Sequence, residues 1–448
     1  MSTTLLRSLA EVVGPSHCLS GAERAPYVID GRTPCGVVFP GSVEEVARVV
    51  REAAAVGVPV VPWGGGTQMH RGAPPGDGAV VVGLRRLGRV LEHEPGDLTA
   101  TVEAGITVET LQVALGARGQ WWPLDPPAPA EATLGGVLAA NTAGPRRHGY
   151  GTARDLVIGL RVVAADGQLV RAGGKVVKNV AGYDLVKLYI GSLGTLGIIV
   201  DATLKLRPRP ESEGACWASF PTLDVAARAA AALAGSELGP VALALLDPLA
   251  AEACAVGAGL PPAAAPALFV AFDGLASAVA WERDEAALRL RAAGAATVDV
   301  LGDAGTARAL VAVREARRAV ANPVAVATAG VLPADLGAYL ETTGATARAA
   351  GFERAAVAQA GHGLVTLLLV PAGGAAPPVS DTAAVLGAWR DAARVRGGHL
   401  AVEWAPLGVR EACPVWDPPG AAGPLMQGLK ARLDPQGVLN PGRFVGGI

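Results

Sequence analysis

Residues 62–68 read Pro62-Trp63-Gly64-Gly65-Gly66-Thr67-Gln68 and directly follow an apolar segment, Val58–Val61, that is typical of a β-strand. Three successive glycines expose backbone N–H groups with no Cβ atom in the way, so this loop can curl around an anion such as a phosphate. Thr67 adds a hydroxyl donor. Taken alone, the stretch fits a tight turn as well as an anion cradle. It has neither the Gly-Lys-Ser/Thr of a Walker loop nor the GxGxxG of a Rossmann fingerprint.

A second stretch of small residues strengthens the anion-cradle interpretation. It runs through Ala132-Thr133-Leu134-Gly135-Gly136, Asn141-Thr142-Ala143-Gly144 and His148-Gly149-Tyr150-Gly151. Small residues again permit a close approach of the backbone, and Thr133 and Asn141 carry side chains that hydrogen-bond phosphate. Two separate loops of this kind suit a pyrophosphate that is gripped from two sides.

A third glycine-punctuated stretch runs from Gly173 to Asp184 and on into the segment Gly191–Ile198. Its lysines, Lys175 and Lys178, fit solvated loop charges as well as ligand contacts, and Tyr183 fits a half-buried core position. The residue types alone do not decide between these interpretations.

The first half of the chain predicts alternating strands and helices. Ser42 with Glu45 three residues later forms a capping-box pattern at the start of a helix. The dipeptide Asp166-Gly167 between two apolar runs indicates a two-residue hairpin loop. Further expected elements are strands at 37–39, 58–61, 80–82, 99–103, 160–164, 168–171 and 196–206 and a helix at 107–118.

The composition changes at Arg207-Pro208-Arg209-Pro210, and the chain is richer in alanine from Glu211 onward. Pro-rich stretches of this kind stop a strand and mark a domain boundary. The pattern beyond it predicts an α+β domain with an antiparallel sheet. Its expected elements are strands at 217–220, 241–246, 268–272 and 364–370, helices at 276–293 and 382–396, a loop at 372–378, and a helix with an extended tail over 429–444.

Charge, hydropathy and cysteine usage exclude several classes of protein. The net charge is −2 with acidic and basic residues mixed along the chain, so there is no electrostatic footprint for nucleic acid. No apolar run is long enough to span a bilayer, and the start of the chain does not resemble a secretory signal, which favours a cytoplasmic protein. The five cysteines are scattered, which argues against a disulfide framework, an iron–sulfur cluster and a metal centre, and we expect them to be reduced.

These motifs in this order resemble the FAD-binding domain of the vanillyl-alcohol oxidase, or PCMH, superfamily. The resemblance covers about the first 210 residues and rests on Pro40–Val46, Gly64–Thr67, Thr133–Gly136, Gly182–Asp184 and Gly191–Gly197. It implies an α+β protein with a two-lobed PCMH-type domain that binds FAD, followed by an α+β cap domain. The residues that it implies as cofactor contacts are Trp63, Gly64, Gly65, Gly66, Thr67, Gln68, Thr133, Gly135, Gly136, Asn141, Gly144, Gly149, Gly151, Gly197, Ile198 and Asn440.

Within this superfamily the chain most resembles the D-2-hydroxy-acid dehydrogenase branch. The tail Leu433–Arg443 is similar to that branch's C-terminal signature, which folds back beside the flavin. The stretch Gly174–Asp184 is similar to the FAD-binding E subunit of glycolate oxidase. Leu193 points the same way, since the catalytic D subunit and its relatives usually have glutamate there.

The chain departs from the catalytic members of that branch at one motif. Those members carry a His-Ala-Gly-Asp-Gly-Asn-Leu-His type sequence, whose histidines serve a metal or the substrate. The corresponding stretch here is 359–366, in which Gln359 and Thr366 replace the two histidines. Neither is a good ligand for a transition metal. His362 is then a lone histidine, and such residues are more often structural than ligands.

The resemblance also bears on how FAD is attached. In members that tether FAD, the covalent histidine usually follows the glycines of the first loop, where this chain has Thr67. His70 lies nearby but out of register. Non-covalent FAD is therefore expected.

The sequence thus predicts an FAD-binding domain at 1–210, a cap or substrate domain at 211–424 and a returning segment at 425–448. The leading hypothesis is an FAD-binding subunit of a glycolate-oxidase-like complex, with a homologous flavoprotein and an iron–sulfur protein as partners. One alternative is a self-sufficient D-lactate or D-2-hydroxy-acid dehydrogenase. Another is a non-catalytic subunit. Candidates for contact with a 2-hydroxy acid are His362 and an arginine such as Arg314, Arg317 or Arg443.

Overall fold

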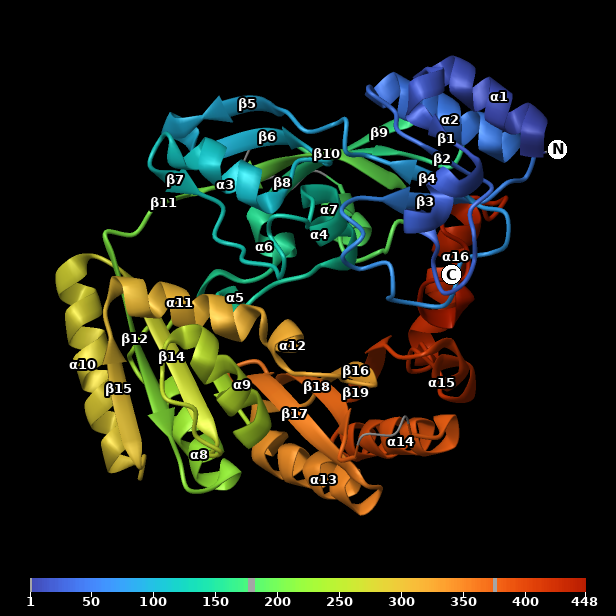
Figure 1. The fold of residues 1–448 in the computed structure, drawn as a ribbon. Helices are drawn as coiled ribbons and strands as arrows, with labels where there is room; N and C mark the ends of the chain where they lie inside the picture. The colour runs from blue at the N-terminus through green and yellow to red at the C-terminus, as the bar shows by residue number, and fades with distance from the viewer. Residues whose placement is uncertain (1, 176–181, 374–376) are drawn as a thin grey trace. The chain divides into compact units, whose positions relative to one another are not determined.

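The computed structural model describes residues 2–175, 182–373 and 377–448 of the chain. They form two compact units (Figure 1): unit 1 comprises Met1–Ala143, Gly151–Arg209 and Pro418–Ile448, and unit 2 comprises Gly144–Tyr150 and Pro210–Asp417. Unit 1 combines helices with one mostly parallel and one antiparallel sheet, and unit 2 combines helices with one antiparallel sheet, which confirms the predicted α+β class. The stretch Val176–Ala181, part of the third glycine-punctuated segment, lies outside the described residues.

The first sheet of unit 1 carries the first glycine loop at the end of a strand. Its strand order is β1-β2-β4-β3, with bounds Cys18–Leu19, Gly36–Val38, Val80–Gly83 and Val60–Trp63. Strands β2, β4 and β3 are parallel. Strand β3 begins and ends two residues later than predicted and leads directly into Gly64. Helix α2 (Val43–Ala55) begins after Ser42, whose hydroxyl accepts a hydrogen bond from the Glu45 N–H at 3.2 Å.

The second sheet of unit 1 is antiparallel throughout. Its order is β5-β6-β10-β8-β9, with bounds Val90–Glu94, Thr99–Glu103, Ile198–Lys205, Val157–Val163 and Leu169–Gly173. The hairpin predicted around Asp166-Gly167 is present, but its loop is longer than two residues, because the Ala164 N–H donates to the Gln168 carbonyl and the Gly167 N–H donates to the Ala164 carbonyl. Gly167 has φ +74°, which matches a three-residue loop ending in a left-handed glycine.

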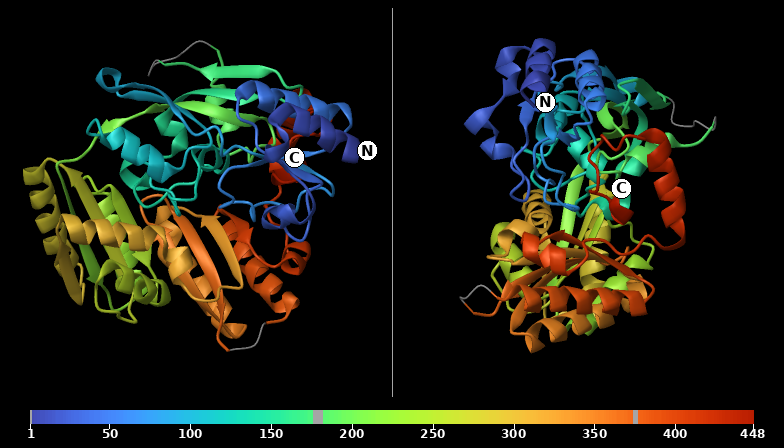
Figure 2. Two further views of the ribbon diagram at one scale, coloured as in Figure 1. Left: turned by 45° about the horizontal axis from the view of Figure 1, so that its top comes forward. Right: turned by 90° about the vertical axis from the view of Figure 1, so that its right-hand side faces the viewer.

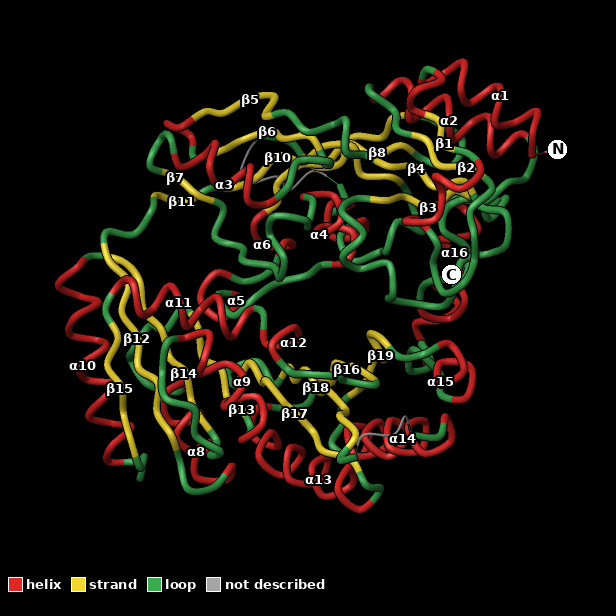
Figure 3. The backbone as a smooth tube through the Cα atoms, in the orientation of Figure 1, coloured by secondary structure: helices red, strands yellow, loops and turns green. Residues whose placement is uncertain are grey.

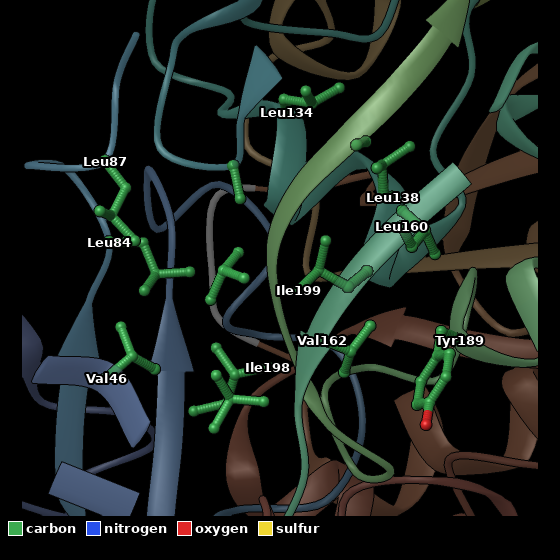
Figure 4. Packing of buried hydrophobic residues seen from close by; sticks show 14 of the residues in the cluster. Val46, Leu84, Leu87, Leu134, Leu138, Leu160, Val162, Tyr189, Ile198 and Ile199 are labelled. Atoms are coloured by element: carbon green, nitrogen blue, oxygen red, sulfur yellow. The ribbon is translucent and has the colours of Figure 1, made fainter. Parts of the chain in front are cut away.

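One hydrophobic core joins the two sheets of unit 1. Figure 4 shows Val46 of α2 and Leu84 beside Ile198 of β10, with Leu160 and Val162 of β8 in the same cluster. Leu134 and Leu138 of α4 (Leu134–Ala140) are fully buried in it. Burial of each such side chain stabilises the fold by about 1.5–3 kcal/mol. The short helix α4, which carries the second glycine pair, is thereby fixed against the strands.

The remaining elements of unit 1 frame this core. The last helix, α16, and the tail after it run along the unit and are red in Figure 2. The tail joins the first sheet, since Leu439 forms a parallel bridge with Val60. These remaining helices and short strands are α1 (Ser2–Val13), α3 (Val108–Gly116), α6 (Ala153–Leu156), α7 (Leu185–Tyr189), α16 (Gly423–Leu433), β7 (Gln120–Trp121) and β11 (Arg207–Pro208).

Unit 2 is built on one eight-stranded antiparallel sheet, yellow in Figure 3. Its order is β15-β12-β14-β13-β17-β18-β16-β19, with bounds Thr297–Leu301, Ser212–Ser219, Ala267–Gly274, Ala242–Leu246, Phe352–Gln359, Leu364–Pro371, Ala325–Gly330 and His399–Trp404. The four predicted strands correspond to β12, β13, β14 and β18. Strands β15, β16, β17 and β19 were not predicted, and β16 and β17 are rich in alanine, which has a low intrinsic preference for strands.

Helices cover both faces of this sheet. Residues of α8 (Leu223–Ala234), α10 (Ala276–Ala292), α13 (Leu336–Ala349) and α14 (Val379–Val395) share one core with one face. Residues of α9 (Pro248–Ala258), α11 (Asp303–Arg314) and α12 (Ala316–Ala319) share another core with the opposite face. Helix α15 (Leu407–Ala412) packs against α14. All five cysteines of the chain are free thiols, as predicted.

The segment Gly144–Tyr150 belongs to unit 2 although its neighbours in sequence belong to unit 1. Arg146 pairs with Asp273 at 2.9 Å and with Glu213 at 2.6 Å, and the Tyr150 hydroxyl donates to Asp273 at 2.6 Å. Burial is the main cause that raises the pKa of Asp273, while Tyr150 and Arg146 oppose the shift. This insertion, which contains α5 (Arg147–Tyr150), was not predicted from the sequence.

A buried ion pair fixes the strand that ends at Gln359. The Asp247 carboxylate caps α9 through the Ala250 N–H at 3.0 Å, accepts from the Ala356 N–H at 2.9 Å and pairs with Arg354 at 2.8 Å. Both side chains are almost fully buried, at 4% exposed for Arg354 and 2% for Asp247.

We therefore expect Asp247→Ala to lower the free energy of unfolding by about 3–5 kcal/mol, because it leaves the buried Arg354 unpaired. The measurement is urea denaturation followed by far-UV circular dichroism. Asp299→Ala, an exposed change on β15 of the same unit, serves as the control and should cost less than about 0.5 kcal/mol. An equal effect of the two changes would contradict the role given to this pair.

Candidate cofactor site

A pocket in unit 1 opens at the glycine loops. About 710 Å³ of space free of protein atoms lies in it and at its mouth, and part of that space is open solvent. Five stretches of the chain contribute to its walls: the loop after β3, Leu84, helix α4, the segment from loop 191–197 into β10, and the C-terminal tail. The lining residues are Pro62, Trp63, Gly64, Gly65, Gly66, Thr67, Gln68, Met69, Leu84, Gly135, Gly136, Ala139, Ala140, Leu193, Gly194, Gly197, Ile198, Ile199, Asn440 and Arg443.

Most of the residues predicted to contact the cofactor come together in this pocket. They are Trp63, Gly64, Gly65, Gly66, Thr67, Gln68, Gly135, Gly136, Gly197, Ile198 and Asn440. The structure thus assembles segments that are far apart in the sequence into one cavity wall.

Five of the predicted contacts do not line this pocket. Thr133 caps α4, where its hydroxyl accepts from the Gly136 N–H at 3.3 Å. Asn141 ends α4 in the left-handed conformation with φ +50°. Gly151 has φ +81° and lies against Asp155. Gly144 and Gly149 belong to unit 2, where the Gly144 carbonyl accepts from Gln359 and the Gly149 N–H donates to the Val241 carbonyl.

The two glycine loops touch each other at the base of the pocket. A Cβ atom on Gly64 would lie 2.1 Å from the Thr133 hydroxyl oxygen, and one on Gly65 would lie 1.8 Å from the Glu131 carbonyl oxygen. Atoms cannot approach that closely, so any side chain at either position forces the loops apart. The structure therefore gives the glycines a second role, because they allow one loop to pack directly against the other.

The first loop presents unused backbone donors. The N–H groups of residues 64–68 donate no hydrogen bond to an acceptor in the described part of the chain. Backbone N–H groups need a partner, which water or a ligand supplies when the protein does not. A cluster of successive N–H groups lining a cavity suits the oxygens of a phosphate. By contrast, the Gly135 N–H in the second loop is used internally, by the Ala104 carbonyl at 2.7 Å.

Asn440 brings a buried acceptor to the pocket. Its Nδ2 donates to the Leu193 carbonyl at 2.6 Å, and since that carbonyl only accepts, the orientation of the amide is fixed. The Oδ1 atom is then left buried with no partner in the described residues, although Asn440 is only 4% exposed and lines the cavity. An orphaned buried acceptor of this kind is costly unless a ligand donates to it. FAD, which carries both a pyrophosphate and N–H donors, fits the pocket.

Arg443 lines the pocket but is occupied with the protein itself. Its guanidinium donates to the backbone carbonyls of Met69, Arg71 and Ala73 at 2.7, 2.6 and 3.0 Å. These bonds tie the tail to the segment after the first glycine loop. Arg443 thus holds that segment, and its contact with a substrate carboxylate stays a prediction.

The residues at 359–366 form the end of β17, a turn and the start of β18 in unit 2. Gln359 donates to the Gly144 carbonyl at 3.3 Å. His362 is exposed, and its ring lies edge-to-face against His148 with 5.2 Å between centroids. Burial, followed by the charge of His362, lowers the pKa of His148 to about 4. Partial desolvation of the His362 ring, followed by the charge of Arg147, lowers the pKa of His362 although part of the residue is exposed.

The other two arginine candidates lie in unit 2 beside carboxylates. Arg314 pairs with Glu315 at 2.9 Å, and Arg317 pairs with Glu403 at 3.4 Å. Glu403 also accepts from the Thr328 hydroxyl at 2.8 Å. The part of the chain that the structure describes contains no cluster of three or more His, Cys, Asp or Glu residues suited to a metal ion.

Sequence reasoning missed several residues that shape these sites. Met69, Ala139, Ala140 and Gly194 line the pocket, and His148 is the partner of His362. Ala139 and Ala140 lie one helical turn after Gly135 and Gly136 on α4. Small residues at this spacing share one face of a helix, so the sequence could have predicted that both alanines line the pocket. Nothing in the sequence indicated the contact between His148 and His362, because they are far apart in the chain.

Comparison with known proteins identifies the family. The family model described as "FAD binding domain" matches residues 34–173, and the model described as "FAD linked oxidases, C-terminal domain" matches residues 209–444, more than half of the chain. None of the helices formed by the described residues combines the length and the apolar character needed to cross a membrane.

Three curated relatives match part of this chain. Glycolate oxidase subunit GlcD of Bacillus subtilis is 36% identical over 275 residues, which cover 59% of this chain and 58% of GlcD. D-2-hydroxyglutarate dehydrogenase of Xanthomonas citri is 42% identical, with 43% of this chain and 41% of the relative covered. The probable mitochondrial D-lactate dehydrogenase of Danio rerio is 37% identical, with 54% and 49% covered. The chain spans about half the length of the curated relatives that it matches.

Solved structures share the fold over almost the whole chain. A substrate-bound p-cresol methylhydroxylase superposes with a TM-score of 0.78 at 16% identity and covers 98% of this chain and 96% of its own. An alkyldihydroxyacetonephosphate synthase gives 0.75 at 20% identity, with 98% and 86% covered. The predicted PCMH-type fold and the FAD cofactor are thus confirmed, and the chain belongs to the FAD-linked oxidases.

Proposed function

We propose that this chain is the FAD-binding subunit of a glycolate-oxidase-like complex that oxidises a 2-hydroxy acid, with FAD bound without a covalent link. Bound FAD supplies the two-electron redox chemistry, while the protein sets its position and access. The N–H groups of residues 64–68 hold the pyrophosphate in this account, and Asn440 accepts a hydrogen bond from the cofactor. In this proposal unit 1 is the FAD-binding domain with its returning C-terminal segment, and unit 2 is the cap or substrate domain.

The single observation that carries the subunit assignment is the chemistry of residues 359–366. Removal of the hydroxyl proton by a positioned base contributes roughly 10²–10⁴ to the rate of such a reaction. Gln359 cannot accept a proton near neutral pH, and Thr366 is a poor base. His362 has a lowered pKa beside a neutral His148, so it is a weak base as well. This stretch therefore supports a chain that depends on a partner for fast turnover.

The choice of the E subunit over the D subunit follows from the differences between this chain and the catalytic members of its branch. The curated relative from B. subtilis is the D subunit of glycolate oxidase, yet this chain lacks the histidine pair expected of catalytic members and has Leu193 where they usually have glutamate. Both differences favour the role of an E subunit. We propose a homologous flavoprotein and an iron–sulfur protein as the partners and the cytoplasm as the location.

One observation favours a second function, a self-sufficient D-2-hydroxy-acid dehydrogenase. D-lactate and D-2-hydroxyglutarate dehydrogenases are among the relatives that the chain resembles. In this alternative an arginine binds the substrate carboxylate, and the candidates are Arg314, Arg317 and Arg443. The third hypothesis, a non-catalytic subunit, predicts a purified protein without flavin.

The attachment of FAD is tested by acid precipitation of the purified protein. Because Thr67 stands at the tethering position of the first loop, the yellow colour should remain in the supernatant. Colour that stays with the pellet would show a covalent link. A colourless protein would contradict the whole proposal.

The contact between the glycine loops is tested by Gly65→Ala. The added Cβ atom must displace the Glu131 carbonyl, so the phosphate cradle should widen and FAD affinity should fall at least about tenfold, or about 1.4 kcal/mol. Gly96→Ala is the matched control, since its Cβ atom would meet nothing within 4 Å. The measurement is a fluorescence titration of apoprotein with FAD. Equal affinities for the two variants would show that the first loop does not hold the cofactor.

Dependence on a partner is tested by comparing turnover of glycolate and D-lactate by the isolated chain and by the co-expressed complex. The isolated chain should turn over slowly and the complex faster, because residues 359–366 offer no strong base. Rapid turnover by the isolated chain that is lost in His362→Ala would reject the subunit assignment and favour the self-sufficient dehydrogenase.

A further inference from the structure

The ammonium group of Lys430, on α16, uses all of its hydrogen-bonding capacity inside unit 1. It donates to the Thr195 carbonyl at 2.7 Å, to the Leu439 carbonyl at 2.9 Å and to the Asp434 carboxylate at 2.7 Å. An ammonium has three donors, so none is left over. The Lys430 side chain is only 13% exposed and that of Asp434 is fully buried.

Two of these acceptors belong to different walls of the cofactor pocket. Thr195 lies in the loop 191–197, between the lining residues Gly194 and Gly197. Leu439 directly precedes Asn440, which lines the pocket and whose buried Oδ1 atom has no partner in the described residues. Lys430 itself does not line the pocket. Lys430 therefore links the segments that form two walls of the pocket without lining the pocket itself.

Backbone hydrogen bonds to β3 also fix the position of the tail around residues 438–440. The Val60 N–H donates to the Val438 carbonyl at 2.8 Å, and the Asn440 N–H donates to the Val60 carbonyl at 2.8 Å. Asp434 accepts from the Val438 and Leu439 N–H groups at 2.9 and 2.8 Å. Strand β3 ends at the first glycine loop, so the tail connects that loop to the loop 191–197.

Two residues that line the pocket have backbone angles in the left-handed region. Leu193 has φ +54° and Asn440 has φ +42°, a region in which residues other than glycine are uncommon. Such conformations are unfavourable and persist only when neighbouring contacts fix them. The bond from Asn440 Nδ2 to the Leu193 carbonyl joins these two residues, and Lys430 fixes the segment on either side of that bond.

We propose that Lys430 is a positioning residue for the cofactor. It acts through Leu439 and Thr195, and it keeps the Oδ1 acceptor of Asn440 and the Leu193 backbone in the geometry that the bound cofactor requires. The inference concerns FAD binding and does not depend on the identity of the substrate or of the partner subunits.

The test is Lys430→Met in the FAD-loaded protein, with the rate of FAD release followed by the fluorescence of free FAD well below the unfolding temperature. Loss of a supporting contact of this kind typically weakens a site about 10–100-fold, so release should accelerate by at least about tenfold. The visible circular dichroism of the bound flavin should also change, because the acceptor beside it moves. If the single variant folds poorly, the double variant Lys430→Met with Asp434→Asn replaces it, because it removes the carboxylate that the first change leaves buried and unpaired. The double variant should show the same acceleration of FAD release.

Two controls separate positioning from general stability. Arg432→Met changes an exposed cation on the same helix and should release FAD at the wild-type rate. Leu9→Ala removes a fully buried side chain that does not line the pocket, so it should lower the unfolding temperature without altering the flavin spectrum. Wild-type release and an unchanged spectrum in a folded Lys430 variant would overturn the proposal, as would an equal acceleration in Leu9→Ala.

Discussion

The cofactor site depends on the absence of two Cβ atoms. Gly64 and Gly65 let the loop after β3 lie directly on Thr133 and Glu131 of the second loop, at distances that no other residue permits. This contact brings the end of the parallel strand β3 to the start of α4. Residues 64–68 line the cavity, and their N–H groups donate to no acceptor in the described residues. The hydrophobic core fixes α4 against this loop, because Leu134 and Leu138 of α4 are buried in that core.

The local pattern of the sequence predicted eleven of the residues that line this pocket. Particular residue types favour particular backbone geometries. This holds for three glycines after a strand, a threonine before a glycine pair and an asparagine in the tail, so the sequence alone could predict these positions. The sequence did not indicate that the Glu131 carbonyl also excludes a Cβ atom at Gly65. The roles of Thr133 as a helix cap and of Arg443 as a clamp on the segment 69–73 needed the tertiary structure.

Unit 2 shows where sequence patterns were insufficient. Three of the six residues of β16 and three of the eight residues of β17 are alanine. Both segments form strands because each pairs with a neighbour on either side, in a sheet that is covered on both faces by helices. The segment Gly144–Tyr150 reads as part of the FAD-binding half, but Arg146 and Tyr150 attach it to Asp273 and Glu213. Long-range ion pairs of this kind leave no periodic trace in the sequence.

The central claim is that the N–H groups of the first glycine loop bind the cofactor. Amide hydrogen exchange measured by mass spectrometry, on the protein with and without FAD, tests it most directly. Exchange is slow only where an N–H group has a hydrogen-bond partner, and in the described protein residues 64–68 have none of their own. The account predicts that FAD slows exchange of the peptide spanning residues 64–68 and of the tail around Asn440. Exchange at residues 64–68 that is unchanged by saturating FAD would contradict it.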